Sequence, residues 1–268
     1  GDGVMSTIVW DIRIPRIVVC LLVGGGLGLA GVLIQLSTRS PLGDPNLFGI
    51  GGGAAIFLAT VAAGIISVGQ FGMFLGCIVS SVFVGMFLAK LISSIDLSPT
   101  KLAIMGIAVG ALTITIGTSV ISYGRVFPTQ VVGLVSGSFT SSNWTMIYYL
   151  FPTFSIAILT SVIFSHKFYP IMLGDIVSRS LGVNPLKTRT ITMGLVGILS
   201  GASVYAAGLV GFVGLTSPHI AKRIIGKTPS NLIFGSSLIG AITTLFADQL
   251  SRLLFAPTEL PVGMVTTA

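Results

Sequence analysis

Apolar runs of roughly twenty residues recur along the whole sequence, and they constrain its fold more than any other feature. They lie at 14–36, 47–66, 71–92, 102–123, 145–164, 190–213 and 232–254. A helix of about 20 apolar residues spans the hydrocarbon layer of a bilayer. Only 8% of the residues are charged, against about 25% in soluble domains. We therefore expect an all-α, polytopic membrane helix bundle that forms a single domain over residues 1–268.

The net charge of +7 reflects the distribution of basic residues between the spans. Basic residues concentrate in cytoplasmic loops of membrane proteins and contact anionic lipid there. If the long polar segment 170–189 is cytoplasmic, most basic residues share its side, and Arg13, Arg16, Arg125 and Arg252 remain outside. We expect membrane lipid, and no nucleic acid, as the partner that this charge implies.

The stretch from Gly208 to Arg223 interrupts the apolar pattern with glycines, Ser217-Pro218 and a basic pair. Proline removes a backbone donor and disfavours helix in the preceding residue, which predicts a break near Pro218. Backbone freed inside a membrane must be sheltered by protein or water. We expect a short half-helix that returns to the cytoplasm, with an architectural role for His219 rather than a ligand role.

Patterns typical of catalysis or metal binding are missing from this sequence. Cys20 and Cys77 lie inside apolar runs, and His166 and His219 are far apart, so none has metal-site spacing. Gly226-Lys227-Thr228 resembles the end of a phosphate-binding loop, but the required first glycine and preceding strand are absent. We expect no metal, no cofactor and no catalytic residue, and hence no enzyme.

Charged residues near the outer ends of the spans are costly in a membrane unless they are paired or functional. Asp248 and Arg252 are four residues apart, so they share one helix face, either as an intrahelical pair or as a functional site. Arg13 and Arg16 lie on the same outer side. These arginines predict either an acidic partner that docks from outside or side chains that extend to the interface.

The polar segment 170–189 mixes apolar Ile171, Leu173, Ile176 and Leu181 with charged residues. Gly182 then favours a helix end. This pattern predicts a short cytoplasmic helix pair that contacts a soluble partner or, alternatively, the membrane surface. The connection 124–144 predicts a short interfacial helix near residues 131–135 or a plain loop.

Seven stretches follow one another along nearly the whole chain: RIPR at 13–16, the glycine-rich run with Gln35, SPLGDPNLFGIGGGA at 40–54, LGDIVSRSLGV at 173–183, GFVGLTSPHIAKRIIG at 211–226, ADQLSR at 247–252 and ELPVGMVTTA at 259–268. Together they resemble the FecCD-type permease subunits of type II ABC importers, which take up iron–siderophores, haem and cobalamin. The resemblance implies about ten helices in the full protein, the first missing and the last truncated here, in the cytoplasmic membrane of a bacterium.

The resemblance also implies partners: a pair of ABC ATPase subunits, an extracytoplasmic substrate-binding protein and a second permease subunit, identical or paralogous. The implied ATPase coupling loop comprises Leu173, Gly174, Asp175, Arg179, Leu181 and Gly182, with Asp175 where the family usually has glutamate. The implied binding-protein docking residues are Arg13, Arg16 and Arg252, and the implied inner gate is Ser98, Pro99 and Thr100.

The expected function is ATP-driven import of an iron(III)–siderophore by alternating access. Haem or cobalamin carried by the same machinery is the first alternative. An ion-coupled secondary transporter is the second, and it would need an intramembrane carboxylate, for which Asp248 is the candidate.

Overall fold

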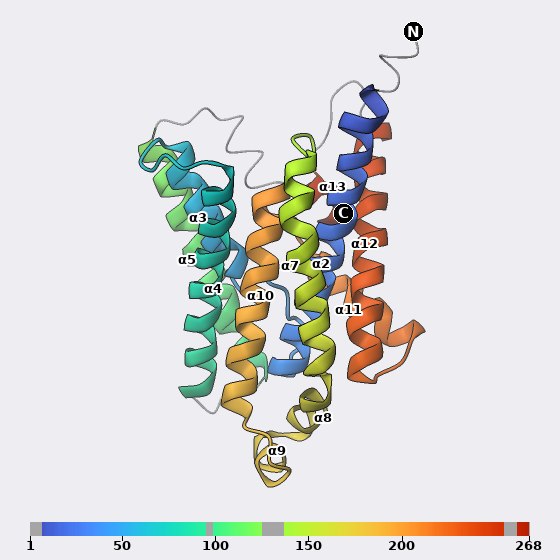
Figure 1. Ribbon diagram of the computed structural model, residues 1–268. Coiled ribbons are helices and arrows are strands. Elements are labelled where there is room, and N and C mark those ends of the chain that lie inside the picture. Colours follow the sequence, from blue (N-terminus) through green and yellow to red (C-terminus); the bar gives the residue numbers. More distant parts are fainter. Residues whose placement is uncertain (1–6, 95–98, 125–136, 255–261, 268) are drawn as a thin grey trace.

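The computed structural model describes residues 7–94, 99–124, 137–254 and 262–267, and every regular element among them is a helix (Figure 1). The long helices are α2 (Ile14–Thr38), α4 (Gln70–Ser94), α5 (Pro99–Tyr123), α7 (Trp144–Ile163), α10 (Pro185–Ala207) and α12 (Pro229–Leu254). The shorter elements are the π-helix η1 (Ile8–Arg13) and the α-helices α3 (Ile50–Ala62), α8 (Ser165–Leu173), α9 (Asp175–Ser180), α11 (Val213–Ile224) and α13 (Val262–Thr267).

Six of these helices are long and apolar enough to cross a membrane, which confirms the all-α membrane bundle. The expected span at 47–66 is wrong, because α3 has 13 residues and begins only at Ile50. Residues 39–49 form an irregular link between α2 and α3, so the residues left before Gly64 make only a short helix. The expected interfacial helix near 131–135 falls outside the described residues.

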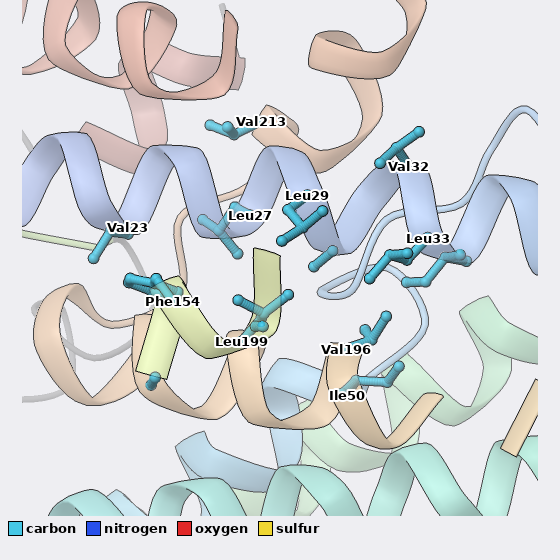
Figure 2. Close-up of a cluster of buried hydrophobic side chains, with 14 of the residues drawn as sticks. Val23, Leu27, Leu29, Val32, Leu33, Ile50, Phe154, Val196, Leu199 and Val213 are labelled. Atoms are coloured by element: carbon cyan, nitrogen blue, oxygen red, sulfur yellow. The ribbon is translucent and has the colours of Figure 1, made fainter. Parts of the chain in front are cut away.

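The core of the bundle is built around α2 and α10, which are mostly buried, whereas α4, α5 and α7 are largely exposed. Figure 2 shows this core, with Leu27 of α2 near Leu199 of α10 and Phe154 of α7, and Leu33 of α2 near Val196 of α10. α2 is apolar on every side, as expected for a helix surrounded by others.

Glycines let the central helices approach their neighbours closely. A Cβ on Gly28 of α2 would collide with the Ser236 carbonyl oxygen of α12, and one on Gly201 of α10 would lie 2.5 Å from the Cys77 carbonyl oxygen of α4. Gly24 and Gly197, each four residues earlier, make equivalent contacts with α12 and α4. These glycine pairs, each spaced four residues apart, therefore mark two close helix contacts, as expected for small-xxx-small spacing in membrane helices.

The two half-helices α3 and α11 start inside the bundle. The break before α11 spans Gly208 to Phe212, both at positive φ (71° and 64°), so the break expected near Pro218 is wrong. Pro218 lies within α11, where it removes only one backbone donor. Glycine at Gly208 permits the sharp change of direction, and the proline inside the helix does not cause it.

The start of α11 is tied to the link that precedes α3. Asn46 Nδ2 donates to the Val210 carbonyl oxygen at 2.6 Å, and Asp44 lies against Gly214 in the first turn of α11. A carboxylate is stabilised at that place by the positive end of the helix dipole. At the other end of α11, Lys222 Nζ donates to Gln35 Oε1 at 2.9 Å. Both half-helices are thus sheltered by protein contacts, as membrane-embedded irregular backbone requires.

Candidate functional site

The polar features of the bundle gather at its two opposite ends. The short helices α8 and α9 protrude at one end, and η1 lies at the other (Figure 1). Arg39, Arg179 and Arg189 lie at the α8–α9 end, while Arg13 and Arg252 lie on the helix ends far from it. This distribution matches the two-sided arrangement expected from the basic residues.

The α8–α9 end exposes apolar side chains beyond the bundle. Leu173 is 55% exposed, Ile176 87% and Leu181 58%. Gly174, at φ 120°, separates the two helices, and Gly182, at φ 78°, follows α9. Both values favour glycine, which explains the glycines on either side of α9. The structure therefore contains the expected short helix pair, and Arg179 is exposed on it.

Asp175, the first residue of α9, is held by two arginines from other parts of the chain. Its two oxygens accept from Arg189 Nη1 and Nη2, both at 2.8 Å, in a bidentate pair. Arg39 Nη2 donates to Asp175 Oδ1 at 3.2 Å. Arg189 is buried and also donates through Nε to the Ser37 carbonyl oxygen near the end of α2 at 3.2 Å. Charge-assisted bidentate pairs of this kind are strong and fix geometry.

The outer end contains a buried ion pair between two helices. Arg16 of α2 donates from Nε and Nη2 to the Asp248 carboxylate of α12, with the shortest contact at 2.8 Å. The two side chains are 9% and 1% exposed. Arg16, one of the three implied docking arginines, is thus buried and paired at the outer end of the bundle.

Arg13 and Arg252 lie one helical turn further out than this pair. Arg13 is exposed and Arg252 is half-buried. Since Arg13 precedes Arg16 by three residues and Arg252 follows Asp248 by four, the ion pair between their helices brings the two outer arginines to the same end of the bundle. Spacing alone does not predict this link, because Arg16 and Asp248 are 232 residues apart.

One stripe on the exposed surface of α5 carries small and hydroxyl-bearing side chains, beside large exposed apolar ones such as Ile104 and Leu112. Ala108, Ala111, Thr115, Thr118 and Ser122 recur at helical spacing, and all are exposed. The Thr115 hydroxyl donates to the Ala111 carbonyl oxygen at 2.8 Å, which leaves its oxygen lone pairs on the surface. Such a stripe suits a neighbouring helix or a polar pathway better than it suits lipid tails.

The residues expected to form an inner gate lie at the start of α5. Pro99 and Thr100 begin this helix, and Ser98 falls outside the described residues. His219 is exposed on α11, and the described residues hold no group of three His, Cys, Asp or Glu side chains able to bind a metal.

Three parts of this site were not assigned from the sequence: Arg39 and Arg189 around Asp175, the Arg16–Asp248 pair, and the Gln35–Lys222 contact. Each joins residues far apart in the chain. A local pattern does account for Asp44 in the link before α3. Its Oδ1 accepts from the backbone nitrogen of Asn46 two residues later, as aspartate commonly does in turns.

Comparison with known proteins identifies the family. The model of the FecCD transport family matches residues 2–268. The chain belongs to the FecCD transport family. This FecCD protein is 32% identical to YfmD, a permease protein of an Fe(3+)-citrate import system in Bacillus subtilis, over 99% of this chain and 82% of that protein. It is also 32% identical to the vitamin B12 import system permease protein BtuC of Salmonella schwarzengrund, over 96% of this chain and 79% of that protein.

A solved structure supports the same assignment. A metal-chelate type ABC transporter in an inward-facing conformation superposes on this FecCD protein with a TM-score of 0.87 at 26% identity, over 99% of this chain and 85% of that chain. The protein is thus the permease subunit of an ABC importer and a multi-pass protein of the bacterial inner membrane. It works with a second permease subunit, and ATP hydrolysis belongs to a separate ATPase subunit.

Proposed function

We propose that this permease imports an iron(III)–siderophore by alternating access, driven by an ATPase pair on the α8–α9 side. The observation that carries the proposal is the stripe of small and hydroxyl-bearing side chains on α5, a helix whose one charged residue is Lys101. In an assembly of two permeases, identical or paralogous, this stripe would form a weakly interacting wall. A wall with few charges lets a bulky chelate pass without being held.

Similarity to relatives favours an iron chelate as the cargo. The permease proteins YfmD and YfmE belong to Fe(3+)-citrate import systems, and YfmE is 34% identical to this chain. A permease of an iron(3+)-hydroxamate system, FhuG, is 29% identical. Cobalamin is the second candidate, because BtuC is as similar as YfmD.

Ion-coupled transport is the less favoured mechanism. It would require an intramembrane carboxylate free to bind and release a cation. Asp248 is engaged by Arg16, and Asp44 lies at the positive end of α11. The candidate Asp248 is therefore not free to carry a coupling ion, which supports ATP as the energy source.

At the outer end, we propose that Arg13 and Arg252 meet acidic residues of an extracytoplasmic substrate-binding protein, with Arg16 in a supporting role. Exposed charges steer association and weaken with salt. Charge reversal by Arg13→Glu should therefore weaken complex formation at low ionic strength, while Lys227→Glu at the opposite end should not. Equal binding-protein affinity for both variants would contradict this assignment.

At the inner end, we propose that the ATPase docks on the coupling loop 173–182, with α9 and its apolar side chains at the centre. Ile176→Asp would place a charge in that contact and should prevent co-purification of the ATPase pair. Ile224→Asp, the same substitution at an exposed isoleucine at the end of α11, is the matched control for general damage. Normal ATPase recovery with the Ile176 variant would show that α9 is not the contact.

The transport proposal is tested by uptake into proteoliposomes that contain the permease with its ATPase and binding protein. We expect ATP-dependent accumulation of a ferric siderophore. Accumulation of cobalamin in place of the ferric chelate would select the second candidate, and accumulation without ATP but with an ion gradient would overturn the mechanism.

A further inference from the structure

The helix α9 is too short to hold its own position. It contains six residues, and glycines at positive φ, Gly174 and Gly182, lie on either side of it. Helices this short are marginal without tertiary contacts. Its orientation must therefore depend on contacts with the bundle, and the strongest of these is made by Asp175 at its first position.

The contacts of Asp175 reach two separate parts of the bundle. Arg189 belongs to the first turns of α10, is 5% exposed and takes both carboxylate oxygens. Arg39 directly follows the last residue of α2 and begins the link to α3. Arg189 also binds the Ser37 carbonyl oxygen, so α2, α9 and α10 meet at one cluster, which we call the Asp175 clamp: Asp175, Arg39, Arg189 and the Ser37 carbonyl.

Arg39 occupies an unusual backbone conformation. Its φ of 58° lies in the left-handed region, which residues other than glycine rarely adopt. In this conformation the guanidinium lies over Gly174, 3.7 Å from the position of a Cβ there, and reaches Asp175. A strained residue whose side chain completes an ion-pair cluster points to a functional constraint at that residue.

The link that Arg39 begins leads to the proposed pathway. Within residues 39–49, Asn46 binds the Val210 carbonyl oxygen ahead of α11, and Gly49 touches α5, where its Cβ would lie 2.7 Å from the Gly110 Cα. A movement of α9 transmitted through Arg39 therefore has a packed route to both half-helices and to α5.

We propose that Asp175, Arg39 and Arg189 are positioning residues that transmit movement of the coupling helix to α2 and α10, so that ATP hydrolysis is converted into opening of the pathway. Asp175 thus acts inward, on the permease itself, and the apolar side chains of α9 contact the ATPase. This inference rests on the proposed function, because it requires that the ATPase docks on α9.

The test uses the full transporter and compares variants of the Asp175 clamp with a control outside it. Asp175→Asn removes the charge at nearly constant shape. Arg39→Gly removes the guanidinium while glycine tolerates the left-handed backbone, so this variant should fold. Lys187→Gln is the control, because Lys187 is an exposed cation two residues from Arg189.

The expected result is a loss of coupling with the assembly intact. For Asp175→Asn and Arg39→Gly, the ATPase pair still co-purifies and still hydrolyses ATP, but the number of substrate molecules transported per ATP falls by about fivefold or more. The double variant should fall no further than the more affected single variant, because both changes open the same cluster. Asp175→Glu, which keeps the carboxylate, should restore most of the ratio.

Two outcomes would overturn the inference. If Arg39→Gly transports normally while Asp175→Asn releases the ATPase, Asp175 is a direct ATPase contact. If ATP hydrolysis and transport fall together at a constant ratio, the clamp serves stability alone. Failure of the proposed function is recognised separately, by Ile176→Asp retaining the ATPase.

Discussion

Removing Arg16 should destabilise the permease more than removing any exposed arginine. The guanidinium makes three contacts of 2.8, 3.1 and 3.2 Å with Asp248, and both side chains are shielded from solvent. Arg16→Met leaves the Asp248 carboxylate buried without its ion-pair partner. Loss of one partner of a buried pair costs about 3–5 kcal/mol, which is a large part of the stability of a typical domain.

The same argument predicts that removing both charges is far less harmful. In the double variant Arg16→Met, Asp248→Leu both members of the pair are apolar, and apolar replacements of buried pairs are often neutral or stabilising. We expect the double variant to lie within about 1 kcal/mol of the parent, and Arg13→Met, one turn outward and exposed, within about 0.5 kcal/mol.

Reversible unfolding of the purified permease in mixed micelles, followed by loss of helical circular dichroism as denaturing detergent is added, gives these free energies. A double-mutant cycle then isolates the coupling between Arg16 and Asp248. If Arg16→Met costs no more than Arg13→Met, or if the double variant loses the sum of the two single changes, the buried pair does not hold α2 to α12.

Two further predictions use the same unfolding measurement. Gly201→Ala should be strongly destabilising, because its Cβ would lie 2.5 Å from the Cys77 carbonyl oxygen. Gly194→Ala on the same helix has open space and should raise the free energy of unfolding by roughly 0.5–1 kcal/mol. Equal effects of the two changes would contradict the close contact between α10 and α4. Asn46→Leu should lower the free energy of unfolding by about 1–3 kcal/mol, because it removes the 2.6 Å side-chain donor to the Val210 carbonyl oxygen. Asn231→Leu, at an exposed position, should have little effect. An Asn46 variant of unchanged stability would show that the two half-helices are not joined there.

The family was predictable from the motifs along the chain. The helical fold and most spans were predictable from the sequence, because a membrane permits few backbone structures and the length of an apolar run indicates a spanning helix. The error at 47–66 has the same origin. Apolar length does not distinguish a spanning helix from a buried link followed by a half-helix, and α3 begins only after Asp44 and Asn46 have engaged α11. The break expected at Pro218 was misplaced because glycine at Gly208 supplies the positive φ that the turn needs.

The charged residues were harder to predict than the helices. The spacing of Asp248 and Arg252 indicated either an intrahelical pair or a functional site, and it gave no sign that Asp248 binds Arg16 at the other end of the sequence. Asp175 was recognised as part of the coupling loop, but its partners Arg39 and Arg189 come from two different helix ends. Ion pairs between distant segments depend on the three-dimensional packing, which local sequence patterns do not determine.

The central claim, ATP-driven import of an iron(III)–siderophore, is tested most directly by counting transported molecules per ATP hydrolysed. Proteoliposomes that contain the permease, its ATPase and its binding protein are given labelled ferric siderophore, ferric citrate, haem or cobalamin. The account predicts accumulation of the ferric siderophore that requires ATP and stops when the ATPase cannot hydrolyse it. Accumulation of cobalamin or haem alone, or uptake of iron that continues without ATP hydrolysis, would contradict it.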